Sequence, residues 1–173
     1  MSPSPENDRP PHAKNLREGR WSEQFACYAV AKCLARRRPI LAERSPTEII
    51  LASLNYFRQN DIIRLLSFCI MPDHYHAVFF LIGRQSLAEV MAGLGKYTAR
   101  RLNLLFRHQG QFWEEGFFDH RCRDDDDIEE RITYIEHNPV RANLVAKAED
   151  WLFSSAHPSQ TGLLDRDWYA RMR

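Results

Sequence analysis

A short turn between two apolar segments constrains the fold more than any other feature of the sequence. Residues 62–70 and 76–82 are rich in β-branched and aromatic side chains, and Met71, Pro72 and Asp73 lie between them. Pro72 has no backbone N–H to donate to a strand ladder, which favours a turn here. Strands joined so closely must pair antiparallel, because a parallel pair needs a crossover of a dozen or more residues. The sequence therefore predicts a hairpin within a sheet.

Helical and strand patterns alternate on both sides of this hairpin. A strand is predicted over 24–31, and a capping box at 45–48 predicts the start of a helix. A second capping box opens a helix over 86–106, a strand follows over 112–123, and a last helix runs over 124–137. The order β-α-β-β-α-β-α predicts an α+β fold. We expect a single ferredoxin-like or RNA-recognition-like domain with an antiparallel sheet and helices packed mainly on one face.

The chain divides into three parts by composition. Residues 1–20, rich in proline, serine and charge, are expected to form a flexible arm. Residues 21–156 are expected to form the main folded domain, and 157–173 a tail that packs on or beside it. The first fifteen residues have no apolar core typical of a signal peptide, and no apolar run reaches the roughly 18–20 residues that span a bilayer. We therefore expect a cytoplasmic protein without a membrane segment.

The net charge of +1 hides an uneven distribution. The chain has 24 Lys and Arg against 23 Asp and Glu. Residues 1–123 carry 18 basic and 12 acidic side chains, and residues 124–173 carry 6 and 11. Local fields steer ligands more than totals do, so the neutral sum does not exclude a nucleic acid.

Two histidines begin the second strand of the hairpin. His74 and His76 flank Tyr75, and alternation along a strand directs both imidazoles to one face and the phenol to the other. Neighbouring imidazoles can hold a divalent metal ion. The spacing alone also fits two unrelated histidines at a turn.

Tyr134, His137 and Asn138 lie at i, i+3 and i+4 near the end of the last predicted helix, and therefore on one face. This spacing would present a phenol beside an amide or an imidazole. The alternative is that Tyr134 is a core aromatic between Ile132 and Ile135.

Taken together, the ordered motifs between residues 62 and 156 resemble the REP-associated tyrosine transposases of the HUH single-tyrosine superfamily. The motifs are MPDHYH at 71–76, GQFW at 110–113, FFDH at 117–120, YIEHNPV at 134–140, and Trp151 with the serines that follow it. The resemblance implies cleavage and rejoining of single-stranded DNA through a 5′-phosphotyrosine. It also implies that the substrate carries imperfect palindromic hairpins.

The same resemblance implies residue roles. Tyr134 becomes the nucleophile, and His74, His76 and Asn138 become ligands of Mg²⁺ or Mn²⁺. His120 and His137 are candidates to assist the tyrosine, with surface or packing roles as the alternative. A rival nucleophile, Tyr97, ranks lower because it lacks the Asn-Pro-Val context.

Basic residues outside these motifs are candidates for DNA contacts. They are Lys96, Arg100 and Arg101 on the second helix, and Arg36, Arg37 and Arg38 in the first loop. A solvated basic surface is the alternative for both groups. The aromatic residues Trp113, Phe117 and Phe118 are expected mainly in the core, with base stacking as the alternative. The four acids at 124–127 are expected at a helix N-terminus and not at a metal site.

Two further functions stay open on sequence alone. One is a domesticated, non-catalytic protein that binds DNA hairpins. The other is a metal-dependent hydrolase of small phosphoesters, whose activity would survive loss of Tyr134 but not of His74. The resemblance favours a bacterial protein, associated with the nucleoid when bound to DNA, that acts as a monomer or a homodimer.

Overall fold

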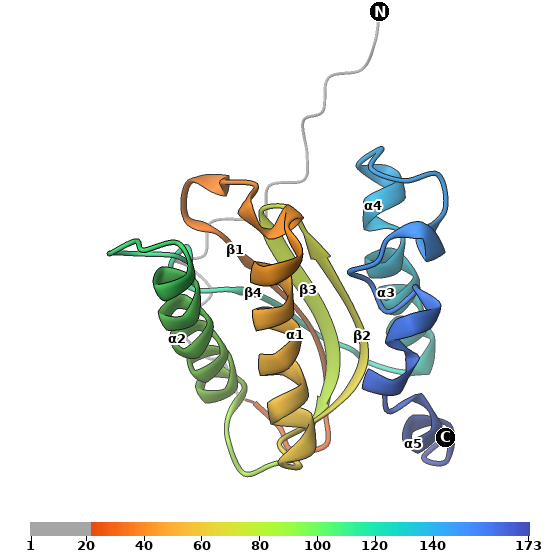
Figure 1. The fold of residues 1–173 in the computed structure, drawn as a ribbon. Coiled ribbons are helices and arrows are strands. Elements are labelled where there is room, and N and C mark those ends of the chain that lie inside the picture. The colour runs from red at the N-terminus through yellow and green to blue at the C-terminus, as the bar shows by residue number, and fades with distance from the viewer. Residues whose placement is uncertain (1–21) are drawn as a thin grey trace, which may run out of the picture.

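A computed structural model describes residues 22–173, so the expected arm at 1–20 lies outside the described residues. Figure 1 shows the arrangement of the elements. The strands are β1 (Cys27–Cys33), β2 (Ile63–Met71), β3 (His74–Leu81) and β4 (Phe118–Arg121). The helices are α1 (Arg44–Gln59), α2 (Leu87–Leu105), α3 (Asp125–Glu136), α4 (Asn138–Arg141) and α5 (Arg166–Ala170). In this part of the chain, no helix has the length and apolar character needed to cross a membrane.

The four strands form one antiparallel sheet in the order β2-β3-β1-β4. Met71 pairs with His74, so Pro72 and Asp73 alone connect β2 to β3. β3 lies between β1 and β2, which are joined through α1, and this is the split βαβ arrangement. The predicted hairpin and fold class are therefore confirmed.

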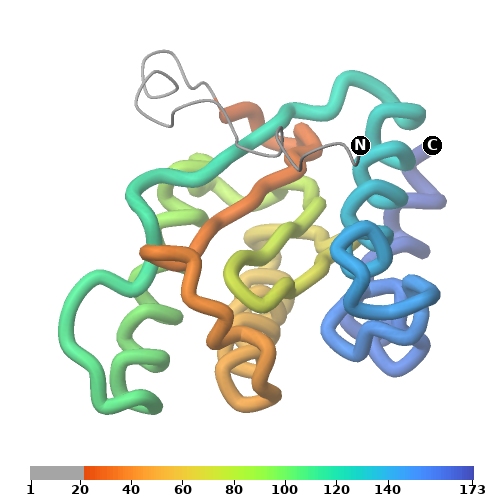
Figure 2. Tube along the Cα trace, turned by 90° about the horizontal axis from the view of Figure 1, so that it is seen from above, coloured from red at the N-terminus to blue at the C-terminus, as the bar shows by residue number. Residues whose placement is uncertain are grey.

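Alternating side chains give the sheet two apolar faces. On one face, Tyr75 and Phe79 of β3 pack in a core with Ile50 of α1 and Val90 of α2. On the other face, Val78 packs in a smaller core with residues of α3 and α5. The two longest helices share one face, as expected, and the structure adds that α3 covers part of the opposite face (Figures 1 and 2).

The two predicted capping boxes have different outcomes. The Ser86 side chain accepts a hydrogen bond from the Glu89 backbone N–H, and the Glu89 carboxylate accepts one from the Ser86 backbone N–H. This capping box is therefore confirmed. The box predicted at 45–48 is wrong, because α1 already begins at Arg44. The hydroxyl of Thr47 donates instead to the Leu41 carbonyl at 2.7 Å, which fastens the first turn of α1 to the preceding loop.

The outer strands differ from their predicted bounds. β1 is shifted towards the C-terminus, and β4 covers only part of the predicted 112–123. Phe112 and Trp113 lie in the loop before β4, and both side chains are buried. Buried aromatic side chains are also typical of strands, which is why the sequence predicted a strand here. Trp113 donates through Nε1 to the Thr98 hydroxyl at 2.9 Å, so contact with α2 fixes this loop.

Candidate functional site

The two histidines of β3 point to the face of the sheet that α3 covers, because Tyr75 between them is buried on the opposite face. Their ring centroids are 4.8 Å apart and their planes are nearly perpendicular. Nδ1 of His74 is 2.6 Å from Oδ1 of Asp73, and Arg37 donates to Oδ2 of the same carboxylate at 3.3 Å. A carboxylate on one ring nitrogen leaves Nε2 of His74 as the atom that can bind a ligand.

His76 is held in its neutral form. Burial, followed by the positive charges of His74 and Arg141, lowers the pKa of His76 to about 3. Neutral imidazole is the form that binds metal ions. His76 is therefore suited to ligation across the whole physiological pH range.

Tyr134 and Asn138 lie at the junction of α3 and α4. α3 ends at Glu136, and Pro139 occupies an early position in α4, where a missing N–H costs nothing. Tyr134 is 38% exposed, whereas Ile132 and Ile135 are buried, so Tyr134 is not a core aromatic. Asn138 is only 7% exposed. The helix thus presents an accessible phenol next to a buried amide.

Arg141 connects these groups, although no sequence motif pointed to it. Its guanidinium carbon lies 3.7 Å from the centroid of the Tyr134 ring. It donates to the Tyr134 carbonyl at 3.3 Å and to Oδ1 of Asn138. Its charge also contributes to the lowered pKa of His76. The signal available in the sequence was its spacing, three residues after Asn138 and seven after Tyr134, which keeps all three on one helical face.

His74, His76 and Asn138 carry ligand atoms of the kinds that divalent metal ions take. His74 and His76 offer imidazole nitrogens, and the amide oxygen of Asn138, which here accepts a hydrogen bond from Arg141, would supply a harder ligand if that bond were displaced. Nδ2 of Asn138 is buried without a hydrogen-bond partner in the described part of the chain. A buried amide N–H without a partner is costly in a purely structural role, and because it donates, an acceptor such as a phosphate oxygen would account for it and a metal ion would not.

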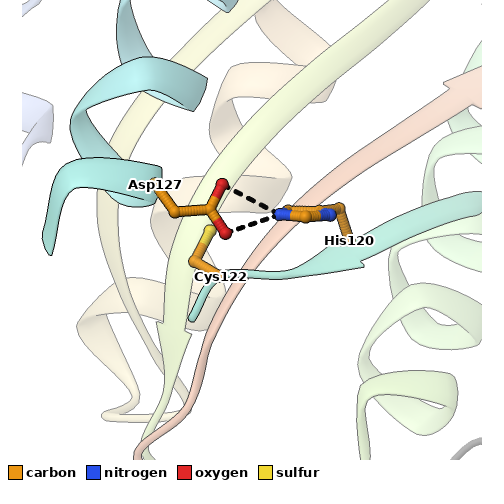
Figure 3. Close-up of side chains that lie close together, drawn as sticks. All are labelled: His120, Cys122 and Asp127. Atoms are coloured by element: carbon orange, nitrogen blue, oxygen red, sulfur yellow. Dashed lines mark hydrogen bonds and ion pairs between the residues drawn. The ribbon is translucent and has the colours of Figure 1, made fainter. Parts of the chain in front are cut away.

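A second cluster lies at the other end of α3 (Figure 3). The ligand atoms of His120, Cys122 and Asp127 lie within 4.8 Å of one another, a spacing that could hold a metal ion. Asp127 is already engaged by His120 at 2.9 and 3.0 Å, by the Arg123 backbone N–H at 3.0 Å and by Arg131 at 3.4 Å. A metal ion would have to displace these donors. In this state the cluster fastens α3 to the end of β4.

The acids at 124–127 begin α3, as expected. Asp124 is the N-cap, and its side chain accepts a hydrogen bond from the Asp127 backbone N–H at 2.9 Å. The hydrogen bond from His120 is the largest cause of the lowered pKa of Asp127, which is about 2. His120 is therefore committed to Asp127, which precedes Tyr134 by seven residues, or about 10 Å along the helix axis.

The other residues proposed from the sequence lie in different parts of the structure. His137 directs Nδ1 to the Thr133 carbonyl of its own helix at 2.9 Å. Tyr97 is 49% exposed and lines a hollow between α1 and α2, across the sheet from the histidines. Lys96, Arg100 and Arg101 are exposed on α2, on the Tyr97 side of the sheet. Of the basic candidates, Arg37 is the one that reaches the histidines, through Asp73.

Comparison with known proteins gives consistent relatives. Residues 13–138 match the model of a family described as transposase, IS200-like. The chain is 30% identical over 115 residues to a Haemophilus influenzae protein provisionally assigned as a REP-associated tyrosine transposase, covering 60% of this chain and 65% of the relative. It is 27% identical over 101 residues to the REP-associated tyrosine transposase of Escherichia coli, covering 57% of this chain and 58% of the relative. The chain thus matches less than two thirds of the length of either relative.

Two solved structures share the fold. One is a REP-associated tyrosine transposase bound to a REP hairpin, with a TM-score of 0.68 and 20% identity, covering 86% of this chain and 88% of that one. The other is a Deinococcus radiodurans protein provisionally assigned as a transposase, with a TM-score of 0.50 and 16% identity, covering 70% and 96%. At these identities the likeness establishes the fold.

Proposed function

Because this chain belongs to the IS200-like transposase family, we propose that it cuts and rejoins single-stranded DNA beside hairpin-forming repeats. One structural relative is bound to a REP hairpin, which supports a hairpin as the substrate. The observation that carries the proposal is the contact of Arg141 with both Tyr134 and Asn138, and the Arg141 charge also lowers the pKa of His76. This grouping combines a nucleophile, metal ligands and a phosphate-binding cation.

In the proposed reaction, the Tyr134 oxygen attacks the scissile phosphorus. The new O–P bond replaces the bond to the 3′-oxygen, which leaves as a 3′-hydroxyl after gaining a proton, and the 5′ side stays on the tyrosine. Exposure of Tyr134 lets its proton pass to solvent. Attack by a 3′-hydroxyl on the phosphotyrosine reverses the step and rejoins the strand, so no nucleotide cofactor is consumed.

Arg141 and the metal ligands have distinct roles. A guanidinium matches the paired oxygens of a phosphate, so Arg141, which packs on the Tyr134 ring, would orient the scissile phosphate towards the phenol oxygen. Mg²⁺ or Mn²⁺, held by His74, His76 and Asn138, would supply Lewis-acid polarisation of a phosphate oxygen. Asp73 fixes the His74 ring for this purpose, and Arg37 holds Asp73 in place.

The wider assignments follow from the same proposal. Residues 21–156 form the catalytic unit, and the bacterial relatives support a bacterial cytoplasmic protein that joins the nucleoid when it binds DNA. A monomer contains every residue of the proposed site, and a homodimer is compatible with it.

A labelled hairpin oligonucleotide with unpaired flanks tests the proposal. With Mn²⁺ present, the wild-type protein should form a covalent adduct that survives denaturing electrophoresis, and Tyr134→Phe should abolish it. Tyr97→Phe is the matched control, since it removes an exposed phenol across the sheet. Tight binding of the hairpin without any adduct, with either metal, would instead favour a non-catalytic hairpin-binding protein.

A further inference from the structure

The cluster of His120, Cys122 and Asp127, here called the His-Cys-Asp cluster, has no role in the proposed DNA chemistry. His120 lies in β4 and Cys122 directly follows the strand, so their side chains point to one face of the sheet. The Cys122 backbone N–H donates to the Cys27 carbonyl of β1 at 2.9 Å, which continues the ladder. Asp127 lies in the first turn of α3, which covers this face. Figure 3 shows the three side chains converging from the strand and the helix.

The distances within the His-Cys-Asp cluster are close to those of a tetrahedral zinc site. Its ligand atoms lie within 4.8 Å of one another, and Nε2 of His120 is 2.9 and 3.0 Å from the two Asp127 oxygens. Zinc bonds of ordinary length to sulfur, nitrogen and oxygen place the ligand atoms roughly 3.4–3.6 Å apart. Sγ of Cys122 therefore has to move by about 1.4 Å or less, which small side-chain rotations achieve.

Asp127 has one oxygen fixed by the backbone and one that an ion can reach. The Arg123 backbone N–H donates to Oδ2 at 3.0 Å. Oδ1 is 3.0 Å from Nε2 of His120 and 3.4 Å from Arg131. Carboxylate ligands of metal ions are commonly held by an outer hydrogen bond such as the one on Oδ2. The Arg131 side chain is 31% exposed, so it can turn to solvent when an ion takes its place beside Oδ1.

The Cys122 thiol ionises more readily than an ordinary cysteine. A hydrogen bond from the Cys27 thiol is the largest cause of the lowered pKa of Cys122, and the charge of Arg131 acts in the same direction. The same contact, followed by burial, raises the pKa of Cys27, which therefore stays protonated. The thiolate is the form of cysteine that binds metal ions. Cys122 thus differs from a buried cysteine that serves only as a small apolar side chain.

The donor set of the His-Cys-Asp cluster favours zinc. Its thiolate and carboxylate carry two negative charges, which match a divalent cation. Sulfur is a poor ligand for Mg²⁺ and Mn²⁺, whereas sulfur, imidazole and carboxylate are all ligands that Zn²⁺ takes. The His120 side chain is 32% exposed, so an ion can enter from solvent and keep a water molecule as its fourth ligand.

We propose that the His-Cys-Asp cluster binds one Zn²⁺ ion through Nε2 of His120, Sγ of Cys122 and Oδ1 of Asp127. Binding releases the thiol proton to solvent and leaves the neutral His120 ring protonated at Nδ1. The ion joins the end of β4 to the first turn of α3, the helix that carries Tyr134. The proposed DNA-cleaving site has no sulfur ligand, so the zinc site is chemically distinct from it and does not depend on the proposed function.

Titration of the reduced full chain with Co²⁺, a spectroscopic substitute for Zn²⁺, tests the proposal. Cobalt bound to a thiolate shows a sulfur-to-metal charge-transfer band in the near ultraviolet, which nitrogen and oxygen ligands alone do not give. The titration uses wild type and a His74→Ala/His76→Ala variant, so that binding at the proposed DNA-cleaving site is removed. Cys122→Ser and His120→Gln are then added separately. Cys33→Ser is the matched control, since Cys33 is a free, half-buried cysteine of β1.

We expect the band in wild type and in the double-histidine variant, with saturation at one equivalent and loss of the band when Zn²⁺ is added. Cys122→Ser should abolish it, and His120→Gln should weaken Co²⁺ binding by more than about 100-fold, beyond the 10- to 100-fold effect of an outer ligand partner. Cys33→Ser should leave it unchanged. No band in wild type, or a band that survives in Cys122→Ser and disappears in Cys33→Ser, would overturn the site. Circular dichroism in the absence of metal establishes that each variant folds.

Thermal melting gives a second measurement that does not depend on cobalt. In the double-histidine variant, Zn²⁺ at about 100-fold above its dissociation constant should raise the melting temperature by about 5–10 °C relative to a chelator. Adding Cys122→Ser should reduce this rise to less than about 2 °C, because the ion then loses its sulfur ligand. An equal rise with and without Cys122→Ser would show that Zn²⁺ binds elsewhere and would overturn the proposal.

Discussion

The guanidinium of Arg141 lies 3.7 Å from the centroid of the Tyr134 ring, and the same side chain donates to Asn138. One cation therefore contacts both the proposed nucleophile and a proposed metal ligand. Asn138 and Arg141 lie in α4, which begins directly after the C-cap of α3, so the geometry is set by the helix junction. Removing this cation should therefore impair the chemical step.

Arg141→Ala should slow adduct formation by about 100-fold, because removing one preorganised donor from a developing charge has an effect of this order. Arg141→Lys should recover only part of the rate, since an ammonium cannot bind two phosphate oxygens in the fork geometry. Single-turnover rates with saturating hairpin measure the effect. Arg171→Ala, an exposed arginine in the C-terminal segment, is the control, and an Arg141→Ala rate equal to it would contradict the assignment.

Asp73→Asn should weaken Mn²⁺ binding by about 10- to 100-fold, because the outer carboxylate fixes the ring orientation and basicity of His74. Isothermal titration of the full chain with Mn²⁺ measures this directly. Asp61→Asn removes a carboxylate that pairs with Arg64 at the surface, and it should leave the affinity unchanged. An equal loss in both variants would show that net charge, and not the position of His74, controls metal binding.

Asp127 should make stability depend on pH. Its folded pKa of about 2, lowered chiefly by the His120 hydrogen bond, lies below the ordinary value near 3.9. The stabilisation is therefore complete above about pH 5, and it declines as the pH falls through 4 towards 2. Asp127→Asn should reduce the free energy of unfolding by about 1–3 kcal/mol at pH 7 and by clearly less at pH 3. Urea unfolding at both values measures this.

The neighbouring Asp126→Asn is the matched control for Asp127, because Asp126 is exposed in the same helical turn. It should change stability by only a few tenths of a kcal/mol at either pH. If Asp127→Asn destabilised the protein equally at pH 7 and pH 3, the lowered pKa would not be the source of its contribution.

Ser155 should be needed to hold α3 in place. Its buried hydroxyl donates to Glu136 at 2.6 Å and receives the Phe68 backbone N–H at 3.1 Å, so it links α3 to β2. Ser155→Ala should lower the free energy of unfolding by about 1–3 kcal/mol, because it leaves buried groups unpaired. Chemical denaturation measures this, with the exposed Ser159→Ala as control. A loss no larger than that of the control would show that Ser155 does not hold the helix.

The sequence predicted those features that local patterns determine. The short connection at Pro72 and Asp73 required the hairpin, and the Ser86 box fixed the start of α2. The start of α1 was misplaced, because the contact of Thr47 with Leu41 outweighs a favourable cap at Ser45. Such a contact joins a helix to a preceding loop, and side-chain preference within the helix does not reveal it.

Some features of the candidate site could likewise be predicted from local patterns, and others could not. The sequence correctly placed His74 and His76 on one face, because residues two apart in a strand point to the same side of the sheet. Arg141 was missed because Pro139 suggested that the helix ended, whereas the chain continues as α4. The commitment of His120 to Asp127 also depends on the packing of α3 against β4, which no spacing along the chain encodes.

The identity of the residue that carries the DNA tests the central claim most directly. Trypsin should release residues 132–141 as one peptide, since Arg131 and Arg141 bound it, and Tyr134 is its only tyrosine. Mass spectrometry of the nuclease-trimmed adduct should find the nucleotide phosphate on this peptide and on Tyr134. A phosphate on Tyr97 or on any other residue, with Tyr134 unmodified, would contradict the account.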